Sequence, residues 1–303
     1  MISSATSPSS SPRSSSAGSV AMDQFHDGHH VRLRSRVHGT YLHADEDGHG
    51  VSLSRRRASM NAAWTVHRNH GDDQHVLLHS AAYGRYLAAT DASAPRGCPG
   101  FRVEQRNCHE LEEEAIRWHA VKTGSGDDIV LRHAAGDRAR YRYLRANGRH
   151  LPWKEDVVSV DYLKNISTMM EWVVDPIPST ELVPRLPRPN RFRLHLAESL
   201  SALLPSRDVD FIGNGQEFFA NPVSFDFRGS SVFRLRKEVA RLMGIRRERN
   251  IPDDLVMYVR AGEFGRFTPL VVNLPRSSQT LVITVGPPAP ANAAAGYPDV
   301  DAE

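Results

Sequence analysis

From Val31 to Arg36 every second residue is an arginine, and the residues between are apolar or small. This period of two is typical of a β-strand with one face in the core and the other in water. His38-Gly39 then predicts a tight turn, because glycine tolerates the positive φ that a hairpin requires. A returning strand is predicted at residues 41–44. The pattern therefore indicates a β-hairpin whose arginines face solvent.

The same pattern returns twice further along the chain. The second copy begins at Val76 and turns at Tyr83-Gly84, and the third begins at Ile129 and resumes at Tyr143 after four extra residues. Each copy ends in a strand that opens with a tryptophan: Trp64, Trp118 and Trp172. The copies begin 45 and 53 residues apart, a spacing typical of a repeat architecture.

Three such units favour one closed fold. A single four-stranded unit cannot bury its apolar side alone, whereas three around a threefold axis close a barrel that leaves no sheet edge. A propeller would need about four to eight blades, and a solenoid of this period would show helices. We therefore predict a mainly β protein that begins with a β-trefoil at residues 22–178. Its repeats are expected near 31–69, 76–124 and 129–177.

A second domain is predicted after a stiff, proline-rich linker at residues 179–190. Alternating residues predict strands at Phe192–Leu196 and Val223–Phe227. A helix follows, with Ser230 or Ser231 as its N-cap and Gly244 as its C-terminal stop. Its apolar face has helical spacing and consists of Val232, Leu235, Val239 and Leu242.

Three more strands are predicted after this helix, at Leu255–Arg260, Phe267–Val272 and Leu281–Val285. The order β-β-α-β-β-β at residues 191–286 favours a smaller α+β domain of the ubiquitin-like β-grasp class. The sequence thus predicts two domains with different architectures, each of ordinary size.

The two ends of the chain differ from the domains in composition. Ten of the first 21 residues are serine, and only Arg13 among them is charged. This composition favours a disordered leader, with an organellar transit peptide as the alternative. The Pro/Ala-rich segment at residues 287–303 is predicted to be a disordered tail.

Composition places the chain among soluble globular proteins, with 40% hydrophobic and 24% charged residues. No apolar run approaches the ~20 residues that a membrane-spanning helix needs. Cys98 and Cys108 could pair, but two reduced thiols in an intracellular protein are favoured. We therefore expect a cytoplasmic location.

Motifs for catalysis or cofactor binding are missing from the sequence. It has no nucleophile elbow, phosphate loop, dinucleotide fingerprint or zinc-protease helix. The histidines near His26–His30 and His67–His70 fall in predicted loops and lack a second pair of ligands for a metal site. Strand histidines such as His79 are expected to be surface or hydrogen-bonded structural residues. We predict a protein that is not an enzyme and binds no metal or cofactor.

The charges indicate where a partner would bind. The net charge of +3 is carried by the C-terminal half: residues 23–178 hold 21 basic and 21 acidic residues, and residues 190–286 hold 14 and 10. An acidic partner is therefore expected mainly on the second domain. The candidate binding residues are Arg55, Arg56 and Arg57 in the first repeat, and Arg234, Arg236, Lys237, Arg241, Arg246 and Arg247 on and after the helix. Nucleic-acid recognition also requires exposed aromatic residues among the cations, whereas the aromatic residues here occupy strand positions expected in the core, so a nucleic acid ranks below a protein.

The repeat at residues 31–44, closed by Trp64-Thr-Val66, resembles the fascin-type trefoil repeat of actin cross-linking proteins. The chain from Met22 resembles more closely a plant family of unknown function, domain-of-unknown-function 569, which is classed as actin-cross-linking-like. The closer match is carried by Asn61-Ala-Ala-Trp64-Thr-Val, by Tyr143–Trp153 and by Thr268–Pro275. Members of this family pair one trefoil with a short β-grasp-like domain.

The resemblance implies a non-enzymatic interaction protein, cytoplasmic or cytoskeletal, that binds a protein or an anionic surface, with actin filaments among the candidates. The alternative is a carbohydrate- or small-ligand-binding trefoil that acts in plant stress or defence. Ricin-type lectins carry a Gln-x-Trp motif in each repeat. The residues before Trp64, Trp118 and Trp172 do not form that motif, which counts against a lectin of this kind.

Overall fold

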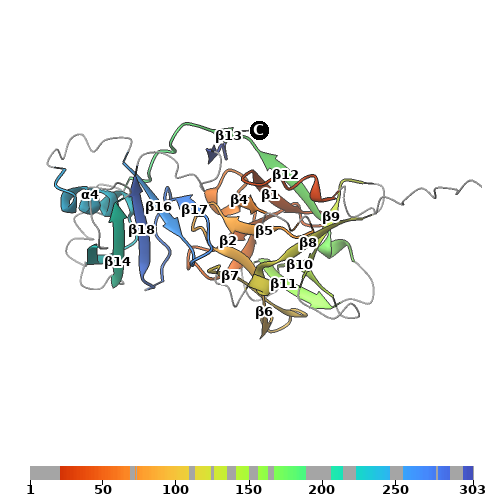
Figure 1. The fold of residues 1–303 in the computed structure, drawn as a ribbon. Helices are drawn as coiled ribbons and strands as arrows, with labels where there is room; N and C mark the ends of the chain where they lie inside the picture. Colours follow the sequence, from red (N-terminus) through yellow and green to blue (C-terminus); the bar gives the residue numbers. More distant parts are fainter. Residues whose placement is uncertain are drawn as a thin grey trace, which may run out of the picture.

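The computed structural model of the protein shows two domains that lie side by side (Figure 1). It describes residues 21–68, 72, 74–108, 113–123, 126–134, 141–149, 156–162, 167–188, 206–213, 223–245, 255–277, 279–286 and 296–302. The larger domain is all β and the smaller is a sheet with one helix. The predicted leader at residues 1–21 lies outside this part of the chain, apart from its last residue.

Six strands of the larger domain close into a barrel. They are β1 (His30–Ser35), β4 (Trp64–His67), β5 (Leu77–Ser80), β8 (Trp118–Lys122), β9 (Ile129–His133) and β12 (Trp172–Ile177). β1 pairs with β4 and β12, β4 with β5, and β9 with β8 and β12. A bridge between Val76 and Trp118 joins the β5 side to β8 and completes the ring. The predicted trefoil barrel is confirmed.

Three hairpins form the cap of this barrel. They are β2 (Tyr41–Ala44) with β3 (Val51–Ser54), β6 (Tyr86–Ser93) with β7 (Phe101–Arg106), and β10 (Arg142–Arg149) with β11 (Asp156–Tyr162). β11 pairs with both β3 and β7, and a bridge between Gly50 and Glu104 connects the first two hairpins. A single helical turn precedes each closing strand: η1 (Met60–Ala62), α2 (Glu113–Ile116) and η3 (Thr168–Met170).

The three tryptophans occupy equivalent places in the core. Trp64, Trp118 and Trp172 are fully buried. Each donates its indole N–H to a leucine carbonyl of the neighbouring hairpin: Leu42 at 3.1 Å, Leu87 at 2.9 Å and Leu144 at 3.1 Å. A buried indole N–H needs an acceptor, and the repeat supplies the same one three times. These bonds tie the cap to the barrel.

The smaller domain has a five-stranded mixed sheet in the order β15-β14-β18-β16-β17. Its strands are β14 (Ser206–Gly213), β15 (Val223–Arg228), β16 (Val256–Arg260), β17 (Phe267–Pro269) and β18 (Leu281–Gly286). β14 and β18 run parallel at the centre, and the other pairs are antiparallel. This is the topology of a ubiquitin-like β-grasp domain, as predicted.

Helix α4 (Val232–Leu242) packs its apolar face on this sheet. Ser231 is the N-cap, and its Oγ accepts the N–H of Arg234 at 3.3 Å. At the other end Gly244 has a φ of +75°, and the N–H of Ile245 donates to the carbonyl of Ala240 at 3.0 Å. The predicted helix and both of its boundaries are therefore confirmed.

Two strand predictions need comment. The predicted strand Phe192–Leu196 lies outside the described residues, and the first strand described in this sheet is β14. Its Val209 and Phe211 are fully buried, whereas Asp210 between them is half-buried. The predicted strand Phe267–Val272 is shorter than expected, because β17 ends at Pro269.

The C-terminal residues 296–302 pack on the trefoil, so the prediction of a disordered tail is wrong for them. β19 (Tyr297–Pro298) pairs antiparallel with β13 (Ser179–Thr180), a strand in the segment expected to be only linker. Tyr297 is 6% exposed. A proline- and alanine-rich composition does not reveal a short segment that another domain buries.

Candidate functional site

The two domains meet along β17 and the turn before it (Figure 1). The N–H of Arg266 donates to the hydroxyl of Tyr86 at 3.0 Å, and its guanidinium pairs with Asp27 at 2.8 Å. The hydroxyl of Thr268 lies 3.2 Å from Nδ1 of His79. The junction is therefore held by specific polar contacts, of which those of Tyr86, His79 and Thr268 are buried.

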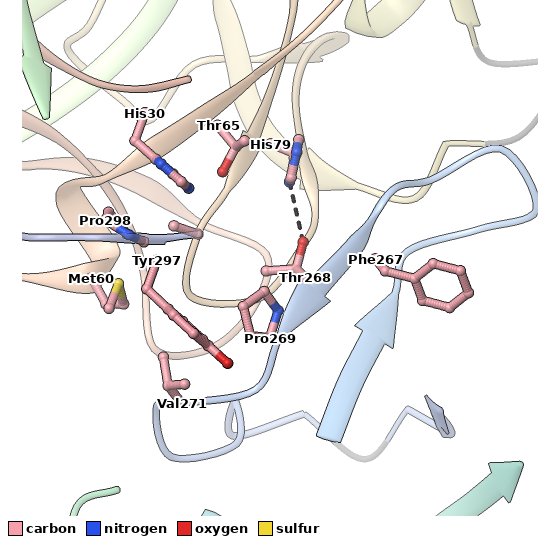
Figure 2. A pocket seen from close by; sticks show the side chains of 11 residues that line it. His30, Met60, Thr65, His79, Phe267, Thr268, Pro269, Val271, Tyr297 and Pro298 are labelled. Carbon is pink, nitrogen blue, oxygen red and sulfur yellow. Dashed lines mark hydrogen bonds between the residues drawn. The ribbon is translucent and has the colours of Figure 1, made fainter. Parts of the chain in front are cut away.

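A small cavity is enclosed at this junction (Figure 2). The trefoil, the ubiquitin-like domain and the C-terminal segment all line it: His30, Met60, Thr65, His79 and Ala81; Phe267, Thr268, Pro269 and Val271; Tyr297 and Pro298. Its volume of ≈ 10 Å³ has room for about one water molecule. A cavity of this size can hold a solvent molecule and is too small for a metabolite.

The histidines of this cavity are uncharged at neutral pH. Burial lowers the pKa of His30 to about 4, with a smaller contribution from the neighbouring His29. Burial also lowers the pKa of His79 well below its ordinary value, and His67 adds to the effect. Nδ1 of His30 and Nε2 of His79 have no hydrogen-bond partner among the described residues. These two nitrogens are able to form hydrogen bonds with a water molecule in the cavity.

Two tyrosines beside the cavity are also neutral. Burial raises the pKa of Tyr86 far above its ordinary value, and its hydroxyl lies 2.8 Å from Nδ1 of His67. Burial raises the pKa of Tyr297 to about 12, with Tyr258 of the ubiquitin-like domain as the next cause. The junction therefore contains uncharged polar groups, which suit tight packing between domains.

The structure separates the three arginines of the first repeat. Arg55 and Arg56 are exposed in the turn after β3. Arg57 is half-buried, and its Nη1 donates to the carbonyl of Ala302 at 2.8 Å. Arg57 thus holds the C-terminal segment, and only the other two are free to meet a partner.

Helix α4 presents three cations on the side opposite its buried face. They are Arg234, Lys237 and Arg241, which follow one another at helical spacing. Arg241 pairs with Glu238 at 2.6 Å, and Nζ of Lys237 lies 5.2 Å from the ring of Phe233.

The remaining basic candidates do not belong to that surface. Arg236 lies on the flank of α4, half-buried, with its Nε shielded from solvent. Arg246 and Arg247 lie outside the described residues. The cations on α4 and the arginines after β3 belong to different domains, so the sequence candidates do not form one cluster.

A polar hollow of ≈ 410 Å³ lies on the trefoil between the first two hairpins and β11. Its lining includes Asp45, Asp47, His49, Ser52 and Glu104, and no Phe, Tyr or Trp is among the described residues that line it. Asp47 accepts the N–H of His49 at 2.8 Å, and Asp45 accepts the hydroxyl of Ser52 at 2.6 Å. Much of this polarity therefore stabilises the loop itself.

Sequence patterns missed the buried polar residues of this region. The alternation placed Arg32 on the wet side of its strand, and His30 was assigned to a loop. Arg32 is fully buried and His30 is 3% exposed, both within β1. The segments that cover them come from much later in the chain, and no local pattern signals such a cover.

Three further predictions concern the pairing of the cysteines, metal binding and membrane-spanning helices. Cys98 and Cys108 are not joined by a disulfide; Cys98 is half-buried and Cys108 is buried. Within the part of the chain that the structure describes, no three His, Cys, Asp or Glu side chains gather as a metal site. None of the described helices is long and apolar enough to cross a membrane.

The closed barrel, its three hairpins and the repeated tryptophan bonds define a β-trefoil protein with an attached ubiquitin-like domain. Residues 22–175 match the model of the β-trefoil domain of unknown function (DUF569), and residues 206–286 match that of the DUF569-associated ubiquitin-like domain. The chain belongs to the DUF569 family. The resemblance to this family that the sequence indicated is therefore confirmed.

Solved structures resemble the trefoil part of the chain. The SDF2-like protein from Arabidopsis thaliana has 14% identity and a TM-score of 0.41, with 49% of this chain and 92% of that chain covered. The ricin B-like lectin of Macrolepiota procera, solved in complex with lactose, has 16% identity and a TM-score of 0.39, with 50% and 96% covered. At these values neither likeness carries a functional argument. No curated protein matches the chain.

Proposed function

We propose that this protein is a non-enzymatic binding module that holds an acidic protein surface against the outer face of α4. The observation that carries the proposal is the charge of this helix, which has four basic residues and one acidic residue. Three of the cations lie opposite the buried face.

The physics of such a surface favours a partner with several negative charges. One exposed ion pair contributes only about 0.2–1 kcal/mol, so a single carboxylate would bind weakly. Several cations on one rigid helix face act together and also accelerate encounter with an acidic partner. Phe233, half-buried beneath Lys237, adds apolar contact area beside the charges.

The test measures binding of the full-length protein to poly-L-glutamate beads and to actin filaments, the partner that the fascin resemblance implies. A variant with Arg234→Ala, Lys237→Ala and Arg241→Ala keeps a high helix propensity. We expect it to lose about tenfold in affinity for the acidic probe at low salt, since three ion pairs of about 0.5 kcal/mol each sum to about 1.5 kcal/mol.

The matched control carries Arg55→Ala and Arg56→Ala, which remove exposed cations from the trefoil. It should bind like the wild type. The proposal is contradicted if the α4 variant binds as tightly as the wild type, or if the wild type binds neither poly-L-glutamate nor actin filaments at low salt. Stronger binding to single-stranded RNA than to poly-L-glutamate would also contradict it.

Carbohydrate binding in the polar hollow of the trefoil is a second candidate. Its volume of ≈ 410 Å³ lies within the ~300–1,000 Å³ of small-ligand sites, and its carboxylates can accept hydrogen bonds from sugar hydroxyls. A glycan array with the wild type and with Glu104→Gln tests this role. Binding that the substitution abolishes would support it, and an array without signal would count against it.

A further inference from the structure

The C-terminal segment at residues 296–302 is bound to the trefoil in the manner of a peptide ligand. Tyr297 and Pro298 form β19 against Thr180 and Ser179 of β13. The ladder continues with the N–H of Asp299, which donates to the carbonyl of Pro178 at 2.9 Å. Addition of an extended segment to a strand edge is a common mode of peptide recognition, with affinity supplied by the main chain.

Two arginines of the trefoil hold the end of this segment. Nη2 of Arg32 donates to the carbonyl of Val300 at 2.7 Å, and Nη1 of Arg57 donates to the carbonyl of Ala302 at 2.8 Å. Arg32 also donates from Nε to the carbonyl of Arg57 at 3.1 Å, so the two side chains form one clamp. Both guanidinium groups are positively charged, and the segment that they hold carries two carboxylates, Asp299 and Asp301. The site therefore suits an acidic segment.

Side chains of the segment enter two separate pockets. Tyr297 lines the junction cavity, and Figure 2 shows its ring extending from β19 toward Pro269 and Val271 of the ubiquitin-like domain. Val300 packs against the small apolar cluster of Ala63, Ala81 and Ile177. Anchors three residues apart, with main-chain bonds between them, are the elements of sequence-specific peptide binding.

The residue before the tyrosine is also specified. Gly296 has a φ of +80°, and a Cβ at this position would lie 2.8 Å from the carbonyl oxygen of Thr180. A side chain there is strained twice, by the backbone conformation and by the close approach. Glycine, tyrosine and valine are thus each favoured at their positions, and Pro298 also lines the cavity, which gives the pattern Gly-Tyr-Pro-x-Val.

The binding of this segment leaves one strong donor of the clamp unused. Nη1 of Arg32 is buried and has no hydrogen-bond partner in the described part of the chain. A buried donor without an acceptor costs about 1–3 kcal/mol. A partner segment that brings one more acceptor to this nitrogen would therefore bind better than the protein's own residues do.

We propose that this face of the trefoil is a docking site for an extended, acidic Gly-Tyr-Pro-x-Val segment of a partner protein, and that residues 296–302 occupy it until such a partner displaces them. A second copy of the chain is a poor competitor, because its segment is identical to one already present at an effective concentration on the order of millimolar. The partner gains by satisfying Arg32 more fully.

The test uses full-length protein and a fluorescein-labelled peptide with the sequence of residues 296–302, followed by fluorescence anisotropy. In the wild type the attached segment competes. Tyr297→Ala removes its anchor and should raise the apparent affinity for the peptide at least about tenfold. Gly296→Ala disfavours the bound backbone conformation while keeping the tyrosine side chain, and should act in the same direction. Arg57→Ala, added to Tyr297→Ala, should weaken the peptide several-fold.

Matched controls separate this site from general loosening of the fold. Tyr162→Ala removes an exposed tyrosine, 46% accessible, from the opposite hairpin and should leave peptide binding as in the wild type. A peptide with alanine in place of the tyrosine should not bind. Two outcomes overturn the proposal. In one, both release variants unfold as cooperatively as the wild type but bind the peptide no better. In the other, they form dimers through exchanged segments, which would make a second copy the occupant.

Discussion

His30 and His79 show how one residue type changes its role with burial. Both lie on the trefoil side of the domain junction and are almost inaccessible, at 3% and 1% exposure. A charged imidazole would lose its hydration there, so the fold selects the neutral form. His30 Nδ1 and His79 Nε2 have no hydrogen-bond partner among the described residues. Protonation of either imidazole would place a charge in this buried site and so opposes the packing of the junction.

The pKa of His30 predicts a specific dependence of stability on pH. Folding lowers this pKa from 6.5 to about 4, so below pH 6.5 the unfolded chain binds more protons than the folded protein. Stability should be complete above about pH 6.5, fall as the pH drops toward about 4, and lose nothing further from this group below that. At about 1.4 kcal/mol per pKa unit, His30 accounts for roughly 3 kcal/mol.

Urea unfolding of the wild type and of His30→Gln at several pH values measures this contribution. Glutamine keeps hydrogen-bonding atoms and cannot titrate, so the variant should lose less stability over the same range. His79 and the carboxylates titrate in both proteins, and the difference between the curves isolates His30. Parallel curves would show that His30 is as easily protonated in the folded protein as in the unfolded chain.

At the scale of elements, regular patterns were predicted well and short ones poorly. The threefold strands and α4 follow from local periodicity, because alternation and helical spacing reflect which face is buried. β14 was missed, although Val209 and Phe211 alternate with charged residues in the same way. β19 has only two residues and offers no period. Its position depends on Arg32 and Arg57, more than two hundred residues earlier.

The candidate sites also divide into those that local periodicity predicts and those that depend on contacts between distant parts of the chain. The cationic face of α4 could be predicted, since helical spacing places Arg234, Lys237 and Arg241 on one side. Arg57 could not be separated from Arg55 and Arg56 by sequence, because the carbonyl that holds it belongs to the last residues of the chain. A run of like charges predicts an exposed surface only where no segment from another part of the chain packs over it.

At the scale of the whole molecule, the packing of the two domains requires a close approach of their backbones. Glycines allow that approach from both sides: a Cβ on Gly84 of the trefoil would lie 3.0 Å from the hydroxyl of Thr268, and one on Gly262 would lie 2.3 Å from the carbonyl oxygen of Cys108. The N–H of Cys108 in turn donates to the carbonyl of Ala261 at 2.8 Å. Backbone thus packs directly on backbone across the junction.

We predict that Gly262→Ala weakens this junction more than it weakens either domain. The added methyl group must push Cys108 away, since a backbone carbonyl cannot rotate aside as a flexible side chain can. Scanning calorimetry of the full-length protein should show a lower Tm and a transition that separates into two parts. Hydrogen exchange should be faster at the amide of Cys108, which loses its partner.

Gly244→Ala is the control that makes this result interpretable. Gly244 is in the same domain and has a similar φ of +75°, but no atom lies within 4 Å of the position of its Cβ. Its substitution therefore costs only the backbone strain, about 1–2 kcal/mol. If Gly262→Ala is no more destabilising than Gly244→Ala, the domains do not support each other's folding. If Gly262→Ala is more destabilising and its unfolding transition splits into two, the junction couples the two domains in the wild type. The α4 surface and the C-terminal segment then belong to one rigid body.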